Sequence, residues 1–377
     1  MLPKAVAMNL KSRNLVLGVV CLVLAIPTAL QLYDDADTFV DVGRIPLMFQ
    51  GFTSDNAGVV LIAEPKAQQP ERPANANPNR PQRVDYNQLV LKLQGDTWRI
   101  GQLTDQDPVL LAGAPIKAQR LESDVFHHLR MIRNDPETLV QANATEEQLK
   151  KYGLDVEHAY LIKVVDKAEK NVLAEVFVGD DSSVGRTGTE AVRGVFVRQV
   201  GSNDVVLYEW EKPWRRNVET DEWTELVLAR VQPPQVRKLT IKNLSTEGKT
   251  FVFEREPGKS MWSAKGVGET LGAVRQTEIE GLIQRFGYLA VDTFERSLNN
   301  AGNMTAYGLH PAQTEVTFTF DEAGTEKVVQ IAIGTRLKDQ NIYYMTCSLE
   351  PSFIMTWGSS MVTNFELDVA TRLFDPK

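Results

Sequence analysis

Cysteine and histidine are both scarce in this chain. Its 377 residues include two cysteines, Cys21 and Cys347, and four histidines. Two cysteines cannot build a four-cysteine zinc site or an iron–sulfur cluster. No two histidines have the spacing of the helical His-Glu-x-x-His zinc motif. The sequence therefore predicts no metal site.

Positive charge is in deficit. The 41 Lys and Arg residues stand against 49 Asp and Glu residues, which gives a net charge of −8. A protein that binds nucleic acid by neutralising phosphates needs the opposite excess. We therefore expect no nucleic-acid partner.

The common catalytic signatures are also missing. The sequence has no Gly-x-Ser-x-Gly elbow and no P-loop, and the glycines of Gly266–Gly272 have the wrong spacing for dinucleotide binding. An anion site at Gly185–Thr189 or a cation site at Asp180-Asp181 is less favoured than an ordinary exposed turn. The sequence predicts no catalytic residues, no cofactor and no enzyme activity.

What the chain does have is an uncharged apolar run near its N-terminus. Leu15–Leu32 contains eleven Leu, Val or Ile residues, and about 20 helical residues span a bilayer core. Three basic residues precede the run and four aspartates follow it, so the positive-inside rule places the N-terminus in the cytoplasm. We expect a cytoplasmic tail at 1–14, an inner-membrane helix at 15–33 and a periplasmic, extracytoplasmic remainder.

A cleaved signal peptide is the alternative for this run. Cleavage after Ala29 would place Pro27 at the −3 position, and cleavage after Ala25 would place Val23 there. Neither gives the small-x-small pair that signal peptidase prefers. An uncleaved anchor is therefore favoured, with Cys21 in the bilayer, Cys347 outside it and no disulfide between them.

A polar segment interrupts the first extracytoplasmic region. Ala67–Arg83 is rich in Pro, Asn and Gln and has no apolar periodicity, so we expect a long disordered loop at about 67–83. A docking peptide is the alternative, although such insertions are usually tolerated surface loops.

The most informative feature is an internal similarity. Tyr152–Leu154 recurs as Tyr307–Leu309, and a hairpin pattern follows each and ends at Gly179 or Gly334. The offset is 155 throughout, so the two copies align without a gap. Each Tyr-Gly-Leu has a structural explanation as a helix stop, because glycine adopts the left-handed conformation beyond a helix end without strain.

The similarity extends upstream of Tyr-Gly-Leu. Strand patterns, the third of which contains a tryptophan in each copy, are expected at Val59–Ala63, Leu89–Leu93 and Thr97–Ile100 and again at Leu239–Lys242, Phe251–Glu254 and Met261–Ala264. A helix follows in each copy, one with apolar positions from Leu121 to Ile132 and one behind a capping Thr277 with Glu280. A short helix from Glu146 to Tyr152 has Thr145 as its cap. We predict an α+β fold with mainly antiparallel sheets, in two tandem repeats at 34–232 and 233–377.

One cluster is the candidate interaction surface. Tryptophan and arginine dominate the energetics of protein interfaces, and they are concentrated at Trp210, Trp214, Arg215 and Arg216. The alternation that ends at Trp210 fits an ordinary strand leading into a linker equally well.

The duplicated Tyr-Gly-Leu, Trp98 and Trp262, and the strand ends at Gly179 and Gly334 together resemble an uncharacterised repeat domain of bacterial envelope proteins. This domain of unknown function occurs in accessory subunits of gliding-motility-type ABC transporters. The resemblance covers about residues 43–377. It implies a membrane-anchored extracytoplasmic subunit that works with an ATPase and a permease, and it brings no catalytic residues.

These features favour a single-pass scaffold or interaction subunit of a bacterial envelope complex, with other membrane or envelope proteins as partners. The alternative is an envelope ligand-binding protein or enzyme that uses a groove between the repeats.

Overall fold

The computed structural model describes residues 45–65, 86–102, 111–185, 191–210, 212–243, 249–265, 271–298, 304–337, 340–366 and 369–376. The expected membrane segment at 15–33 and the expected loop at 67–83 lie outside these residues. Within the described ranges, no helix has the length and apolar character needed to cross a membrane.

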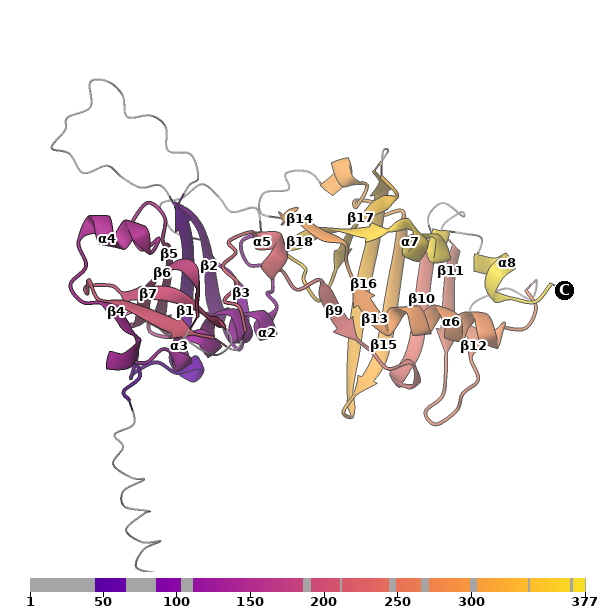
Figure 1. Ribbon diagram of the computed structural model, residues 1–377. Coiled ribbons are helices and arrows are strands. Elements are labelled where there is room, and N and C mark those ends of the chain that lie inside the picture. The colour runs from indigo at the N-terminus through magenta and orange to yellow at the C-terminus, as the bar shows by residue number, and fades with distance from the viewer. Residues whose placement is uncertain are drawn as a thin grey trace, which may run out of the picture.

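The first half of the chain forms one eight-stranded sheet, drawn in indigo to magenta in Figure 1. Its strands, in spatial order, are β3 (Thr97–Ile100), β2 (Tyr86–Gln94), β1 (Ala57–Pro65), β5 (Tyr160–Asp166), β6 (Val172–Gly185), β7 (Ala191–Gln199), β8 (Val205–Glu209) and β4 (Leu139–Gln141). We call this the first sheet.

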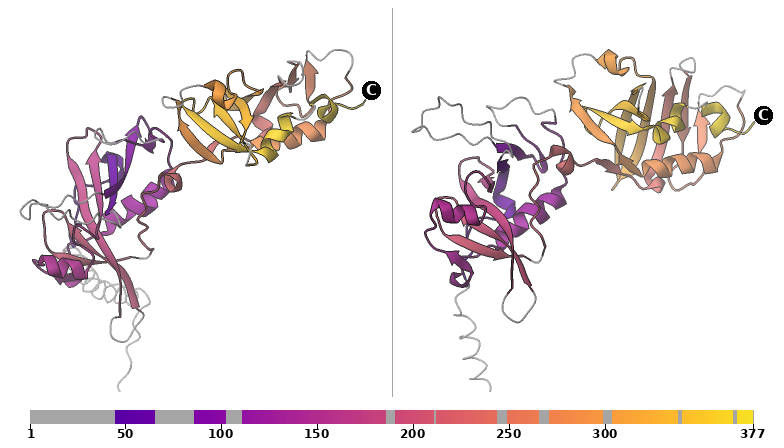
Figure 2. Two further views of the ribbon diagram at one scale, coloured as in Figure 1. Left: turned by 90° about the horizontal axis from the view of Figure 1, so that it is seen from above. Right: turned by 45° about the horizontal axis from the view of Figure 1, so that its top comes forward.

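The second half forms another eight-stranded sheet, drawn in orange to yellow and lying beside the first in all three views (Figures 1 and 2). Its strands, in spatial order, are β12 (Ser263–Lys265), β11 (Lys249–Glu254), β10 (Val236–Asn243), β15 (Thr314–Glu322), β16 (Thr325–Arg336), β17 (Ile342–Cys347), β18 (Phe353–Gly358) and β14 (Thr293–Ser297). We call this the second sheet. A small ladder joins β9 (Val227–Arg230) to β13 (Tyr288–Ala290).

Within the described ranges, the sheets have few helices beside them. They are α2 (Ala118–Leu121), a π-helical turn (Glu122–Phe126), α3 (His127–Met131), α4 (Glu146–Lys151), α5 (Thr220–Trp223), α6 (Gln276–Phe286), α7 (Ser359–Glu366) and α8 (Val369–Leu373), with short 3-10 turns between strands. Every strand pairing that the structure describes is antiparallel. The expected α+β class with antiparallel sheets is therefore confirmed.

The two sheets have the same strand order. In each sheet, the first strand in the sequence, β1 or β10, pairs with the first strand of a long hairpin, β5–β6 or β15–β16. The last strand at the far edge, β4 or β14, precedes that hairpin in the sequence. β-Bulges also fall at matching places. One interrupts the β6–β7 ladder after Val178, and one interrupts the β16–β17 ladder after Ile333.

The local geometry around Tyr-Gly-Leu agrees with its interpretation as a helix stop. Helix α4 has the expected capping box, in which the Thr145 hydroxyl accepts from the backbone N–H of Gln148 and the Gln148 side chain accepts from that of Thr145. Gly153 follows the helix end with φ of +63°, and Gly308 has φ of +65°. Both lie in the left-handed region that favours glycine.

The start of helix α6 differs from the expectation. Thr277 lies inside the first turn rather than at the cap, which is Arg275. Glu280, the expected partner of Thr277, instead accepts hydrogen bonds from Arg255 and from the Trp262 indole, at 2.9 and 2.8 Å. Contacts with the neighbouring sheet edge have displaced the local capping pattern, a common outcome when tertiary partners are available.

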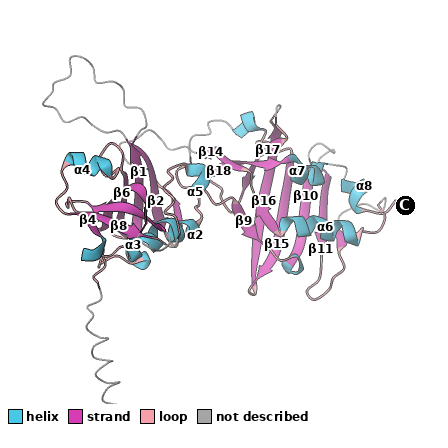
Figure 3. Cartoon of the chain, in the orientation of Figure 1, coloured by secondary structure: helices cyan, strands magenta, loops and turns pink. Residues whose placement is uncertain are grey.

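The inner face of the second sheet packs against helices. Strand β10 alternates buried and partly exposed residues, which gives it one inward face. Phe286 of α6 lies 4.3 Å from Phe318 of β15, measured between ring centroids, and Phe365 of α7 lies 4.8 Å from Phe286. Figure 3 shows both helices across this one face. The opposite face, which we call the outer face, carries Glu315 and Thr317.

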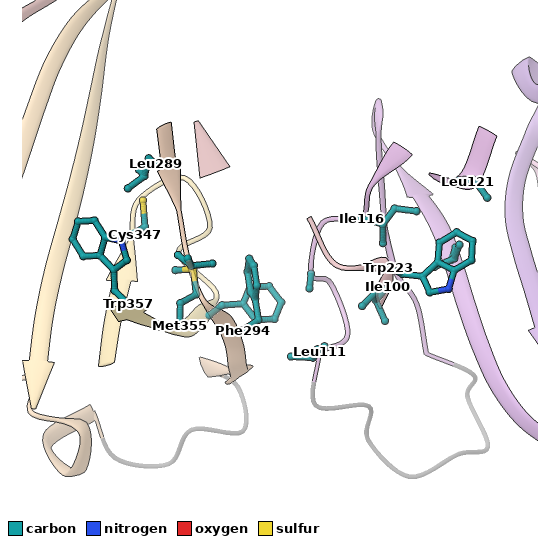
Figure 4. Packing of buried hydrophobic residues seen from close by; sticks show 14 of the residues in the cluster. Ile100, Leu111, Ile116, Leu121, Trp223, Leu289, Phe294, Cys347, Met355 and Trp357 are labelled. Carbon is teal, nitrogen blue, oxygen red and sulfur yellow. The ribbon is translucent and has the colours of Figure 1, made fainter. Parts of the chain in front are cut away.

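The two sheets meet at what we call the sheet junction, formed by Arg99, Gly113 and Glu350. The Arg99 guanidinium donates to both carboxylate oxygens of Glu350, at 2.8 and 3.0 Å, and to the Gly113 carbonyl at 2.8 Å. Figure 4 shows Leu111 and Phe294 on the facing sides of this region. A bidentate pair with side chains 23% and 13% exposed fixes orientation as well as supplying energy.

The sheet junction supports a stability prediction. We expect Glu350→Gln to lower the free energy of unfolding by about 1–2 kcal/mol, because it removes a charge-assisted pair that is largely shielded from water. Glu256→Gln is the matched control, since the Glu256–Lys259 pair is highly exposed and should change stability by less than about 0.5 kcal/mol. Urea unfolding of both variants measures the difference, and equal effects would contradict a structural role for Arg99–Glu350.

Candidate functional site

The four residues of the predicted interaction surface fall into different environments. Trp214 is 3% exposed, Trp210 is half-buried against the core, Arg216 is partly buried and Arg215 is exposed. Arg215 is thus the one member of the four with an exposed side chain. The sequence predicted the surface from residue types alone, and residue types do not determine which side chains are exposed.

Trp214 packs in an aromatic cluster with His128 of helix α3 and Tyr208 of β8. Its indole stacks on the His128 ring with a centroid distance of 4.9 Å and an interplanar angle of 18°, and it meets Tyr208 edge to face at 5.8 Å. His128 is 1% exposed, and its Nδ1 lies 3.1 Å from the Tyr208 hydroxyl. Burial lowers the pKa of His128 to about 4, and the neighbouring His127 adds to this effect. Trp214 therefore secures the chain after β8.

Arg216 fastens the same segment to strand β6. Its guanidinium donates to the Gly179 carbonyl and to the Asp181 carboxylate, the latter at 2.6 Å. It also lies 5.4 Å from the centre of the Tyr160 ring, and the Tyr160 hydroxyl donates to Glu64. The Arg216 guanidinium therefore binds groups of this chain, and Asp181 is its ion-pair partner.

One group of potential metal ligands was not predicted from the sequence. Asp155, Glu157 and His158 follow Tyr-Gly-Leu, and their ligand atoms lie within 4.8 Å of one another. The spacing Asp-x-Glu-His was the only signal in the sequence. Nδ1 of His158 lies 2.9 Å from a carboxylate oxygen of Asp155, which is 1% exposed. Because Nδ1 of His158 and the buried Asp155 carboxylate already bind each other, we interpret these two residues as a pair that stabilises the turn.

The outer face of the second sheet carries a hollow of about 550 Å³. Its floor is made of outward side chains from three neighbouring strands, and its wall comes from Leu298, Met304 and Pro351. The floor includes Glu315 and Thr317 of β15, Gln330 and Ala332 of β16, and Thr346 of β17. Such a mixture of polar floor and apolar wall is typical of a binding site.

Cys347 lies at the edge of this hollow but faces inward. Its side chain is 2% exposed, and burial raises the pKa of its thiol to about 11. A thiol needs its deprotonated form to act as a nucleophile. Cys347 is therefore a packing residue, and the chemistry available in the hollow is binding through hydroxyl, amide and carboxylate groups.

No curated protein and no solved structure matches the chain. The family described as a domain of unknown function (DUF4340) matches residues 114–311, which are slightly more than half of the chain. The matched range begins just before helix α2 and ends in the connection to β15. The resemblance to an uncharacterised domain is confirmed at this level, and the chain belongs to the DUF4340 family.

Proposed function

We propose that this protein is a membrane-anchored scaffold or interaction subunit of a bacterial envelope complex. Residues 1–14 lie in the cytoplasm, 15–33 cross the inner membrane, and the rest of the chain is extracytoplasmic. The apolar run and the charge asymmetry around it support this topology. The family resemblance suggests an ATPase and a permease as partners.

We also infer that the two sheets are copies of one unit. The shared strand order and the matching bulges support this inference. A further support is that a β-carbon on Gly179 would collide with the Tyr152 carbonyl, and one on Gly334 would collide with the Tyr307 carbonyl. Each copy thus packs a glycine of its long hairpin against the residue that ends the preceding helical turn.

The observation that carries the scaffold proposal is the sheet junction between two units of one design. Arg99 and Glu350 tie the units into one body, whose broad sheet faces can hold partners at a fixed spacing. Extraction in mild detergent followed by mass spectrometry of co-purifying proteins tests this role. We expect an ATPase and a permease to be recovered, and recovery of the chain alone in several detergents would contradict it.

Topology is tested separately by cysteine labelling. We expect Lys259→Cys, at a side chain 66% exposed, to react with a membrane-impermeant maleimide in intact spheroplasts. Ser12→Cys is the matched control and should react only after lysis. Both changes are made with Cys21→Ser and Cys347→Ser, because the buried native thiol would report unfolding instead. If position 12 reacts in intact spheroplasts and position 259 does not, the orientation is the opposite of the proposed one.

The second candidate is an envelope ligand-binding protein, and the 550 Å³ hollow favours it. The hollow lies on the outer face of the second sheet, whereas the sequence suggested a groove between the repeats. A bound small molecule in purified protein, identified by native mass spectrometry, would support this candidate.

A further inference from the structure

The hollow has a counterpart on the first sheet. Phe177 pairs with Arg198 in the β6–β7 ladder, one step before the bulge after Val178. Ala332 pairs with Thr346 in the β16–β17 ladder, also one step before a bulge. The Ala332–Thr346 pair of the hollow therefore occupies the place that Phe177 and Arg198 occupy in the first sheet.

A guanidinium fills that place in the first sheet. Arg198 is 8% exposed and lies 4.5 Å from the centre of the Phe177 ring. It donates to the backbone carbonyl of Ser202 at 3.1 Å and to that of Leu154 at 3.3 Å. The first sheet thus stacks its own arginine on an aromatic ring, and backbone oxygens together with the Asn203 side-chain oxygen accept hydrogen bonds from the guanidinium.

The second sheet has shorter side chains at the equivalent positions. Ala332 replaces a phenylalanine and Thr346 replaces an arginine, which removes most of the bulk. The neighbouring Lys163–Glu175 ion pair of the first sheet, with an N–O distance of 3.0 Å, corresponds to the ladder partners Thr317 and Gln330. These replacements account for the open space on the second sheet.

The hollow offers a cation one carboxylate, that of Glu315, which also forms an ion pair with Lys242 of the neighbouring strand β10. Among the described residues that line it, Glu315 supplies a carboxylate and none is a lysine or arginine. Glu315 accepts one bond from Lys242 at 3.1 Å, which leaves its second oxygen able to accept another. Hydroxyls of Thr317 and Thr346 provide further acceptors, and Met304 offers an apolar surface for an aliphatic stem.

We propose that the hollow binds an arginine side chain presented by a partner protein, in the place that Arg198 fills on the first sheet. On the first sheet the chain's own Arg198 would then occupy this site, whereas on the second sheet the equivalent site is open. The inference adds a recognition element to the proposed scaffold role, and it can be tested on the purified chain alone, so it can fail while that role stands.

The test is a titration of the full-length chain in detergent with Nα-acetyl-arginine amide. The chain carries ¹³C-methyl methionine, so that Met304 reports on the hollow and Met261, which is 70% exposed and outside the lining of the hollow, serves as the internal reference. We expect a saturable shift of the Met304 methyl signal at millimolar ligand, no shift at Met261, and at least about tenfold weaker binding of the uncharged citrulline analogue, because a charge-assisted hydrogen bond is lost.

Three variants separate the proposed site from a general affinity for cations. Thr346→Arg should fill the hollow from within and abolish the shift, and Ala332→Phe should do the same through bulk alone. Glu315→Gln should weaken binding by about tenfold. The inference is overturned if the wild type shows no saturable shift up to about 50 mM, if citrulline binds as well as arginine, or if both filled variants respond as the wild type does.

Discussion

Replacing Gly334 by alanine is expected to lower the free energy of unfolding by about 3 kcal/mol, at the upper end of overpacking effects. The new β-carbon would lie well inside van der Waals contact of the Tyr307 carbonyl oxygen and 3.0 Å from Cγ of Leu309. Neither group can move away cheaply. The Tyr307 carbonyl also accepts from the Thr335 hydroxyl at 3.1 Å, and Leu309 is 6% exposed. Urea unfolding, followed by circular dichroism, measures the loss.

Gly281→Ala is the matched control for this substitution. Gly281 lies within helix α6, and a β-carbon there would meet nothing within 4 Å. Alanine should therefore raise the free energy of unfolding by about 0.5–1 kcal/mol, through helix propensity. Overpacking costs at least about 1 kcal/mol. If the free energy of unfolding of Gly334→Ala lies within about 1 kcal/mol of the wild-type value, β16 does not pack closely on Tyr307.

The same reasoning extends to Gly179, whose β-carbon would collide with the Tyr152 carbonyl. That carbonyl accepts from the backbone N–H of Asp180 at 2.9 Å, so it too is fixed in place. A similar penalty for Gly179→Ala would support the inference that the two sheets are copies. These glycines could be found from sequence because the helix stop and the hairpin end are separated by a fixed number of residues.

Local signals were predictable for a physical reason. The capping box at Thr145 and the left-handed glycine after α4 depend on residues within a few positions of each other. The alternation of buried and partly exposed residues along β10 requires only that one face of the strand is buried. The predicted capping box of helix α6 was wrong because Glu280 binds Arg255, a residue distant in the sequence, instead of capping the helix.

Register was predicted only in part. The gapless offset of 155 pairs Lys163 with Phe318, one exposed in character and one apolar. In the ladders, Val60 pairs with Val164 and Leu239 pairs with Phe318, so the buried Val164 and Phe318 occupy matching positions. The offset between these strands is therefore one residue smaller than at the glycines. A single-residue shift exchanges the two faces of a strand, and the hydrophobic core decides between them.

The hollow and the sheet junction could not be predicted. Ala332 and Thr346 face the same space only because β16 and β17 pair in one particular register. Arg99 and Glu350 are separated by 251 positions in the sequence. Trp214 shows the same limit, because an indole that packs on a distant His128 has the same sequence signature as an exposed interface residue.

His128 is expected to make the protein less stable in mild acid. In the unfolded chain its pKa is near 6.5, whereas burial in the fold lowers it to about 4. Between these values the unfolded state binds a proton that the folded state does not, so stability falls as the pH falls. Each pH unit in this window costs about 1.4 kcal/mol, so the whole window of about 2.5 units costs at most about 3.5 kcal/mol. Below about pH 4 this contribution stays constant.

The test compares urea unfolding at several pH values between 7 and 4 in the wild type and in a double variant. His128→Phe with Tyr208→Phe keeps the ring against Trp214 and removes both partners of the hydrogen bond, so neither is left buried and unsatisfied. The double variant should lose the part of the pH dependence that His128 supplies, while His310→Gln, at an exposed position, should retain it. Carboxylates contribute their own slope in all three proteins, and the difference between the curves isolates His128. If the double variant and the wild type have parallel curves, burial does not hold the His128 imidazole neutral.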